Sequence, residues 1–281
     1  MERMKLSELP QSLNWLLYAD PGNTKTSLAA TMALCPDMMP MLHLNVDGGL
    51  LTIRDMEIPD DQISVVDITN TDEFEALYHE LKKEDGPFSD IQSICIDNGT
   101  ELMSMALEEQ IRGNLNRKSK SGKKRSSLDD AWIEDRSAAG NRIGRLFRWY
   151  RDLPQHVVYT AHVRREYPKK ENMPDVSKPP LAVEPDFPPA LSRRMRGYVD
   201  FVWYLVRNND QVSVITQPRG PYFAKTRGVR LMEQFGLGFK WPVGYELMPA
   251  LYETIINKKD FPLEVIHRET PAQEIEEEDG E

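Results

Sequence analysis

The chain has 281 residues, of which 40% are hydrophobic, and this is enough for the core of one large α/β domain. No apolar run approaches the roughly 20 residues that a membrane helix needs, and the first residues lack the apolar stretch of a secretion signal. We therefore expect a cytoplasmic protein without a membrane span. The two cysteines, Cys35 and Cys95, have no second Cys or His at metal-ligand spacing, which argues against a disulfide framework or a zinc site.

The net charge of −10 is distributed unevenly. Six acidic residues lie in the last eight positions, and we predict one domain over residues 1–265 followed by an acidic, disordered tail over 266–281. By contrast, the segment 112–125 contains seven basic residues and no acidic one. The local charge is therefore compatible with an anionic partner, although the chain as a whole is acidic.

Short apolar runs alternate with helical patterns, which predicts βαβ units around a mainly parallel sheet. Two segments, 114–127 and 164–189, are expected to be long loops, since the first is polar and basic and much of the second is rich in proline. The expected strands are Trp15 to Ala19, Met41 to Val46, Ile63 to Ile68, Ile91 to Asp97, His156 to Ala161 and Val199 to Val206, and the expected helices are Lys25 to Ala33, Thr71 to Lys83, Ser137 to Arg151 and Met248 to Lys258.

The segment from Ala19 to Ser27 has the pattern of a phosphate-binding loop. An apolar strand runs into a turn with Pro21 and Gly22, and Lys25 and Thr26 then open a helix. In such a loop the backbone N–H groups cradle phosphates, the lysine reaches the β and γ phosphates, and the hydroxyl binds Mg²⁺. We therefore predict ATP and Mg²⁺ as cofactors, bound at Asp20, Pro21, Gly22, Asn23, Thr24, Lys25, Thr26 and Ser27.

Thr24 departs from the usual loop pattern, in which a glycine precedes the lysine. If this position requires a positive φ, a β-branched residue costs about 1–3 kcal/mol of strain. The sequence therefore predicts a nucleotide site and leaves open how efficiently it hydrolyses the nucleotide.

Three further strands end in polar side chains that we expect at the same edge of the sheet as the loop. Asp97 ends an apolar strand in the manner of a Walker B carboxylate, which holds Mg²⁺. Asp47 follows a second strand and is our candidate general base, with Glu101 as the competing choice. His162 follows a third strand at the carboxyl edge, where ligands of open α/β folds bind.

With these elements in order, the sequence resembles the RecA-like P-loop ATPases of bacteriophages, in particular the short family that includes ATP-dependent single-strand annealing proteins. The resemblance covers most of residues 12–258. It implies a RecA-like α/β fold, ATP hydrolysis, a role in DNA recombination and a homo-oligomer, either a ring or a filament. The segments that carry it are 18–27, 46–50, 94–102, 153–162, 198–202 and 224–227.

The same resemblance implies roles for individual residues. Asp47 stands where RecA-like enzymes usually carry a catalytic Glu, and His162 stands where a polar residue senses the γ-phosphate. Lys225 and Arg227 form a Lys-x-Arg pair that reaches into the phosphate site of a neighbouring subunit and stabilises transition-state charge. Read from local pattern alone, this pair is a solvated strand face.

The family also implies single-stranded DNA as a partner, held by the two long loops, with a single-strand DNA-binding protein as a further candidate partner. The first loop has no aromatic residue for base stacking, so a solvated charge run is the alternative interpretation. The second loop includes Tyr167, which favours it for stacking. The candidate phosphate contacts are Arg117, Lys118, Lys120, Lys123, Lys124 and Arg125 in the first loop, and Arg164 and Arg165 in the second.

Two other functions stay open from the sequence. One is a RecA-like motor or loader acting in replication or DNA packaging, although the absence of a large accessory domain weighs against an autonomous helicase or terminase. The other is a nucleotide-binding interaction module that has lost hydrolysis through Thr24 and Asp47, in which binding acts as a structural switch.

Overall fold

A computed structural model describes residues 12–114, 131–171, 173–209, 211–242 and 247–261 of the chain. Its strands are β1 (Asn14–Ala19), β2 (Met41–Asn45), β3 (Ile63–Asp67), β4 (Ser93–Asp97), β5 (His156–Glu166), β6 (Lys169–Lys170), β7 (Met173–Pro174), β8 (Ala182–Pro185), β9 (Phe201–Asn208), β10 (Gln211–Ile215), β11 (Lys225–Thr226) and β12 (Gly238–Pro242).

The central sheet has the strand order β12-β10-β9-β1-β5-β4-β2-β3. Neighbours from β9 to β3 are parallel, whereas β10 and β12 extend the β9 edge in antiparallel pairing. The central strand β1 is buried along its whole length, as expected for a parallel strand that is covered on both faces. This arrangement confirms the predicted α/β fold with a mainly parallel sheet.

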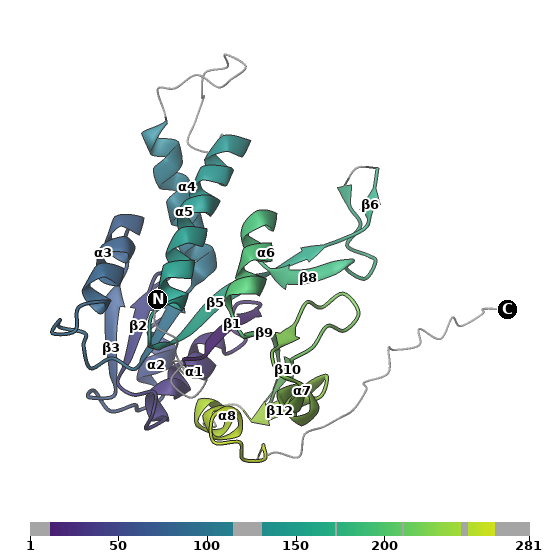
Figure 1. The fold of residues 1–281 in the computed structure, drawn as a ribbon. Coiled ribbons are helices and arrows are strands. Elements are labelled where there is room, and N and C mark those ends of the chain that lie inside the picture. The colour runs from purple at the N-terminus through teal and green to yellow at the C-terminus, as the bar shows by residue number, and fades with distance from the viewer. Residues whose placement is uncertain (1–11, 115–130, 172, 210, 243–246, 262–281) are drawn as a thin grey trace, which may run out of the picture.

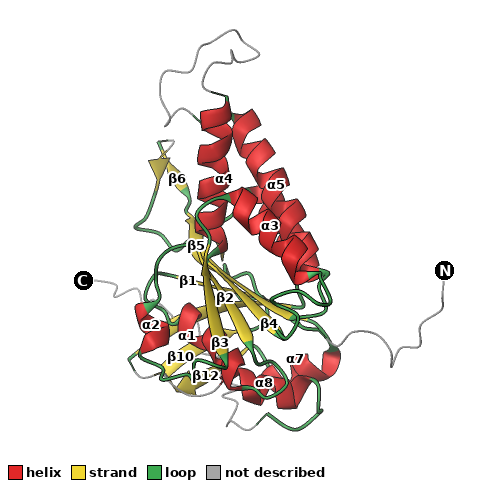
Figure 2. Ribbon diagram, turned by 90° about the vertical axis from the view of Figure 1, so that its left-hand side faces the viewer, coloured by secondary structure: helices red, strands yellow, loops and turns green. Residues whose placement is uncertain are grey.

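Helices cover both faces of this sheet (Figures 1 and 2). One face carries α3, α4, α5 and α6, and the other carries α1, the 3-10 helix η2, α7 and α8. The core is accordingly divided into two apolar clusters, one on each face. The helices are α1 (Lys25–Ala30), η2 (Thr31–Leu34), α2 (Leu51–Arg54), α3 (Thr71–Leu81), α4 (Gly99–Gly113), α5 (Ile133–Arg151), α6 (Pro189–Tyr198), α7 (Val229–Phe235) and α8 (Leu247–Ile255).

Side-chain caps determine where two of the helices begin. The Asn70 side chain accepts a hydrogen bond from the Glu73 backbone at the start of α3, and Asn98 caps α4 in the same way. Helix α5 begins four residues earlier than the periodicity predicts. There the Trp132 N–H donates to Asp135 at 3.0 Å and so satisfies one of the free backbone donors.

The segment 164–189 is not the long loop that we predicted. Strand β5 continues to Glu166 and pairs with β8 in antiparallel register, and β6 and β7 form a short hairpin beyond them. Pro174 and Pro185 end their strands, where a missing N–H is tolerated, so the prolines do not prevent pairing. The result is an arm that projects from the carboxyl end of β5 (Figure 1).

Of the other predicted loop, 114–127, only Asn114 lies within the described residues. The six basic candidates between 117 and 125 lie outside them, as does the predicted tail. In the part of the chain that the structure describes, no helix combines the length and the apolar character needed to cross a membrane.

Candidate nucleotide-binding and catalytic site

The phosphate loop connects β1 to α1, as the sequence predicts. Thr24 precedes α1 with φ = 61° and ψ = 16°, in the left-handed region that favours glycine. Its hydroxyl donates a hydrogen bond to the Asn23 carbonyl at 2.7 Å. The condition for strain at Thr24 is therefore met. The first glycine of the general pattern is also replaced, by the fully buried Ala19.

Lys25 is buried at the base of the loop, with 7% of its surface exposed. Its Nζ donates to the Ala19 carbonyl at 3.2 Å and to the Asp20 carbonyl at 3.1 Å. Burial lowers the pKa of Lys25, while the charges of Asp97, Asp47 and Asp20 oppose this shift. The negative charges of these three carboxylates favour the charged form of the lysine.

Thr26 and Asp97 meet directly, although 71 positions separate them in the sequence. The Thr26 hydroxyl donates to Asp97 Oδ2 at 2.5 Å, and the Thr160 hydroxyl donates to the other carboxylate oxygen. Both predicted metal ligands are thus oxygen donors in contact, the chemistry that Mg²⁺ prefers. Among the described residues, no three His, Cys, Asp or Glu side chains group as a metal site. The donor set fits an ion that also takes ligands from nucleotide phosphates.

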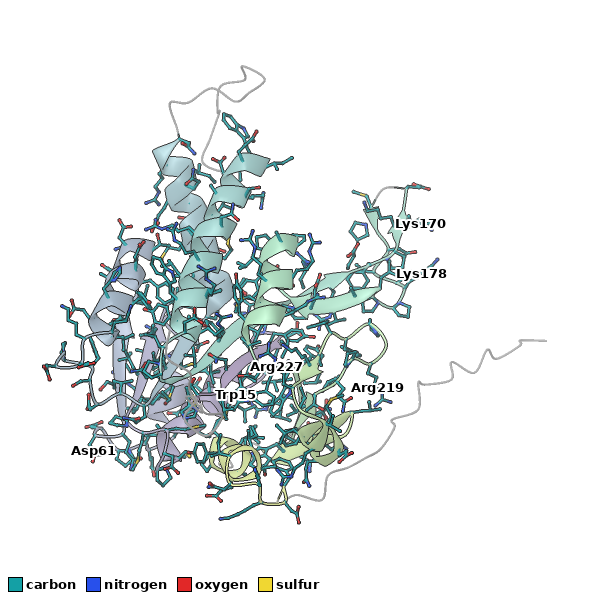
Figure 3. All side chains as sticks on the ribbon, viewed as in Figure 1. Trp15, Asp61, Lys170, Lys178, Arg219 and Arg227 are labelled. Atoms are coloured by element: carbon teal, nitrogen blue, oxygen red, sulfur yellow. The ribbon has the colours of Figure 1, made fainter. Side chains whose placement is uncertain are left out.

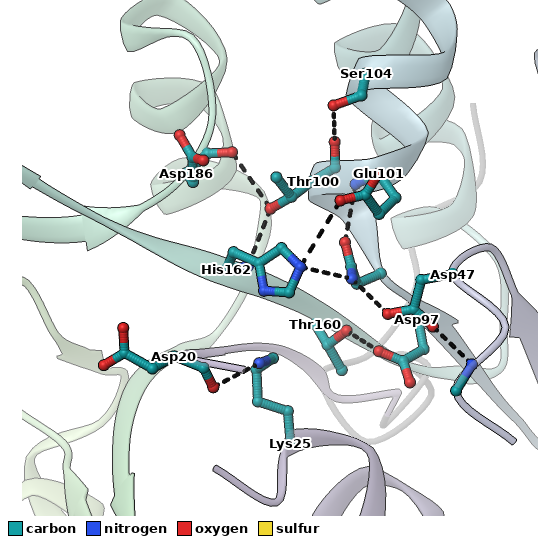
Figure 4. A network of polar contacts seen from close by, with 12 residues as sticks. Asp20, Lys25, Asp47, Asp97, Thr100, Glu101, Ser104, Thr160, His162 and Asp186 are labelled. Atoms are coloured by element: carbon teal, nitrogen blue, oxygen red, sulfur yellow. Dashed lines mark hydrogen bonds and ion pairs between the residues drawn. The ribbon is translucent and has the colours of Figure 1, made fainter. Parts of the chain in front are cut away.

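Asn98, which the sequence did not single out, links Asp47 to His162. Figure 4 shows Asp47, Glu101 and His162 in this polar network. Its Nδ2 donates to Asp47 Oδ2 at 2.8 Å and lies 3.3 Å from His162 Nε2. The amide oxygen accepts from the Glu101 N–H at 2.8 Å, so the whole side chain is held in one orientation. Its place directly after Asp97 is the signal that could have identified it.

Both candidate general bases lie beside this network. The second oxygen of Asp47 accepts a hydrogen bond from the Gly49 N–H at 3.1 Å. Glu101 Oε1 lies 3.8 Å from His162 Nε2, and its side chain is 45% exposed. Both side chains are accessible to solvent, and Asp47 is the more constrained of the two because its carboxylate accepts two hydrogen bonds. A further histidine, the buried His43, lies with Nε2 3.9 Å from Asp97, and burial lowers its pKa.

The two arginines predicted to contact DNA are engaged within the chain. Arg165 makes a bidentate ion pair with Asp20 of the phosphate loop, at 2.8 and 2.5 Å. This pair lowers the pKa of the Asp20 carboxyl, chiefly through the hydrogen bonds from Arg165. Arg164 pairs with Glu184 of β8 at 2.5 Å. The sequence could not reveal these contacts, because 145 positions separate Arg165 from Asp20.

Lys225 and Arg227 lie near the amino end of β9, whereas the phosphate loop follows the carboxyl end of the neighbouring strand β1. Lys225 pairs with Val202 near the start of β9, and Figure 3 shows Arg227 in the same region as Trp15 at the start of β1. Lys225 Nζ donates to the Val199 carbonyl at 2.7 Å, and Arg227 pairs with Asp200 at 2.9 Å. They therefore take no part in the phosphate site of their own chain. Their implied role in a neighbouring subunit stays a prediction.

A cavity of about 300 Å³ opens over the phosphate loop. Two of its lining residues, Thr52 of α2 and Arg207 near the end of β9, were not predicted from the sequence. The other lining residues are Gly22, Asn23, Thr24, Lys25, Thr26 and Ser27.

Comparison with curated proteins finds no match to this chain. A family model described as an AAA domain matches residues 11–228. The match runs from before β1 to just after β11, so it includes the phosphate loop, Asp47, Asp97, His162 and the Lys-x-Arg pair. The chain belongs to the AAA domain family of P-loop ATPases.

Proposed function

We propose that the protein is a Mg²⁺-dependent ATPase that binds single-stranded DNA and promotes annealing or strand pairing as a homo-oligomer, either a ring or a filament. The observation that carries the ATPase part is the 2.5 Å contact between the Thr26 hydroxyl and Asp97, beside the buried Lys25. These are the three side chains that a P-loop enzyme uses to hold a metal-bound triphosphate, and here they converge on one edge of the sheet.

The site residues divide the work of hydrolysis among them. Lys25 places its positive charge on the β and γ phosphates, and Thr26 and Asp97 hold the ion. Bound Mg²⁺ would neutralise part of the phosphate charge. Asp47 orients the attacking water and accepts its proton as the bond from the γ phosphorus to the leaving oxygen breaks, and Glu101 is the alternative acceptor.

His162 and Asn98 serve the γ-phosphate end of the site. Asn98 Nδ2 donates to Asp47 and lies 3.3 Å from His162 Nε2, so Asn98 bridges the candidate base and the histidine. Asn98 also caps α4. A shift of His162 in response to the γ-phosphate would therefore be passed through Asn98 to Asp47 and to the start of α4. This supports His162 as the sensor of the nucleotide state.

The DNA part of the proposal is supported by the position of two structural features. Helices α4 and α5 flank the basic segment that contains residues 117–125, and the arm carries Lys169, Lys170 and Lys178 away from the core (Figure 3). Lysines on a projecting β arm can neutralise phosphates without desolvating a core. The oligomer is supported by Lys225 and Arg227, which lie far from the phosphate loop of their own chain.

The test is ATP turnover of the full chain, measured with and without single-stranded DNA. We expect turnover that DNA stimulates and that Lys25→Ala abolishes, while Lys82→Ala, a matched removal of the exposed lysine that follows α3, leaves it unchanged. Gel shifts with single-stranded oligonucleotides at low salt measure DNA binding separately. A wild-type protein that binds no DNA with ATP and Mg²⁺ contradicts the annealing function, and one that shows no turnover contradicts the ATPase.

One observation favours a second function, a nucleotide-binding switch with little hydrolysis. Thr24 holds the left-handed backbone at the position where a glycine is usual, and Asp47 is one methylene shorter than the glutamate of RecA-like enzymes. Nucleotide binding without turnover, unaltered in Thr24→Gly, would favour this function. Turnover that Lys25→Ala abolishes excludes it.

A further inference from the structure

The cavity over the phosphate loop has one wall that the phosphate chemistry does not use. Arg207 forms this wall from near the end of β9, and its side chain is exposed. The cavity volume of about 300 Å³ lies at the lower end of the range for ligand pockets. The loop backbone and Lys25 already supply the contacts that phosphates need, so Arg207 is left to meet another part of the nucleotide.

The strand order indicates which part that is. Asp97 ends β4, His162 lies on β5, and Asp47 follows β2, so all three lie on the β5 side of β1. Strand β9 is the neighbour of β1 on the opposite side. A triphosphate whose γ end lies at Asp97 and His162 extends over the loop away from them. Its nucleoside end therefore lies toward β9 and Arg207.

The lining of the cavity indicates which part of the nucleoside Arg207 contacts. Apart from Arg207, its lining consists of glycine, asparagine, lysine, serine and threonine, and it contains no aromatic ring. Arg207 is thus the one lining residue with an extended delocalised plane, and a guanidinium stacks well on aromatic faces. We propose that Arg207 stacks on the base of the bound nucleotide and positions its nucleoside end. This inference rests on the proposed nucleotide site.

The local structure orients the guanidinium for this contact. Arg207 pairs with Val212 in the β9–β10 ladder, which fixes its backbone. Its Nε donates to the Asn209 carbonyl at 3.1 Å, so one edge of the guanidinium is held by the turn that follows β9. Within the described residues, no carboxylate lies within ion-pair distance of it. One edge is thus held, while the flat face stays accessible to a ligand.

The test compares two anions that share the triphosphate and differ in the nucleoside. Calorimetric titration measures the dissociation constants of Mg²⁺-ATP and of Mg²⁺-tripolyphosphate for the full chain. We expect Arg207→Ala to weaken ATP binding about tenfold, equivalent to about 1.4 kcal/mol, and to leave tripolyphosphate binding unchanged. Arg207→Lys keeps the charge without the plane and is expected to weaken ATP binding to a similar extent.

The matched control is Arg148→Ala, which removes an exposed arginine on α5 and should change neither constant. If Arg207→Lys binds ATP as wild type does, or if Arg207→Ala weakens both ligands equally, Arg207 acts through charge on the phosphates and the proposal is overturned. Unchanged ATP binding in Arg207→Ala overturns it as well. A wild-type chain that binds neither ligand instead overturns the proposed nucleotide site itself.

Discussion

Replacing Thr24 by glycine tests the link between backbone strain and activity. The left-handed backbone at φ = 61° costs a β-branched residue about 2–3 kcal/mol, the upper part of the range for such sites. Relieving this strain is offset in part, because a glycine loses more backbone entropy on folding, which costs about 0.5–1 kcal/mol. Glycine also removes the hydrogen bond from the Thr24 hydroxyl, which costs a similar amount. We therefore expect Thr24→Gly to stabilise the chain by about 1 kcal/mol, or about 2 °C in Tm.

Urea unfolding of the full chain measures this difference. The midpoint should rise in Thr24→Gly with an unchanged dependence on denaturant, and Thr24→Ala should fall between the two, since alanine keeps the Cβ without the branch. We expect ATP turnover to increase in the same order, from wild type through Thr24→Ala to Thr24→Gly, because a less strained backbone at position 24 lets the loop close around the phosphates. If Thr24→Gly is no more stable than wild type or Thr24→Ala, the strain argument is wrong.

Three further changes probe the site and the fold. Asp97→Asn removes the charge that is expected to bind the metal, so ATP turnover should require at least about tenfold more Mg²⁺. A titration of turnover with Mg²⁺ measures this requirement, and an unchanged requirement would exclude Asp97 as a ligand. Arg165→Ala leaves the Asp20 carboxylate uncompensated beside the phosphates, so ATP affinity should fall about fivefold while the salt dependence of DNA binding keeps its slope. The reverse pattern would make Arg165 a DNA contact. Burial lowers the pKa of His156 to about 4, and the unfolded chain has about 6.5, so this residue should withdraw up to about 3 kcal/mol of stability as the pH falls through that window. His156→Gln, which can still accept the Leu13 N–H bond, should flatten the free energy of unfolding between pH 7 and pH 4, and an equal slope in both proteins would contradict this assignment.

Local patterns were sufficient to predict the parts of the site that follow strands directly. Lys25, Thr26 and Asp97 occupy positions set by a strand that ends at the ligand edge, and the parallel sheet brings them together as that pattern predicts. The strain at Thr24 was predictable for the same reason, because the loop geometry dictates its φ.

Contacts between distant strands could not be predicted. Arg165 reaches Asp20 only because β5 lies beside β1, and Arg207 reaches the loop only because β9 lies on the other side. Strand order decides both, and a single sequence does not encode it in any local pattern. The arm was missed for a different reason: prolines at strand ends look the same in sequence as prolines in a loop.

The bidentate pair of Arg165 with Asp20 joins the phosphate loop to the strand that becomes the projecting arm. A ligand that binds one of these elements and favours one geometry of the pair therefore changes the affinity of the other element for its own ligand. Thermodynamic linkage requires that each ligand change the affinity for the other by the same factor. The side chains of the pair are 31% and 40% exposed, so water limits its strength to about 1 kcal/mol. If the arm binds the proposed DNA partner, this contact alone would couple ATP binding and DNA binding by at most about fivefold in affinity.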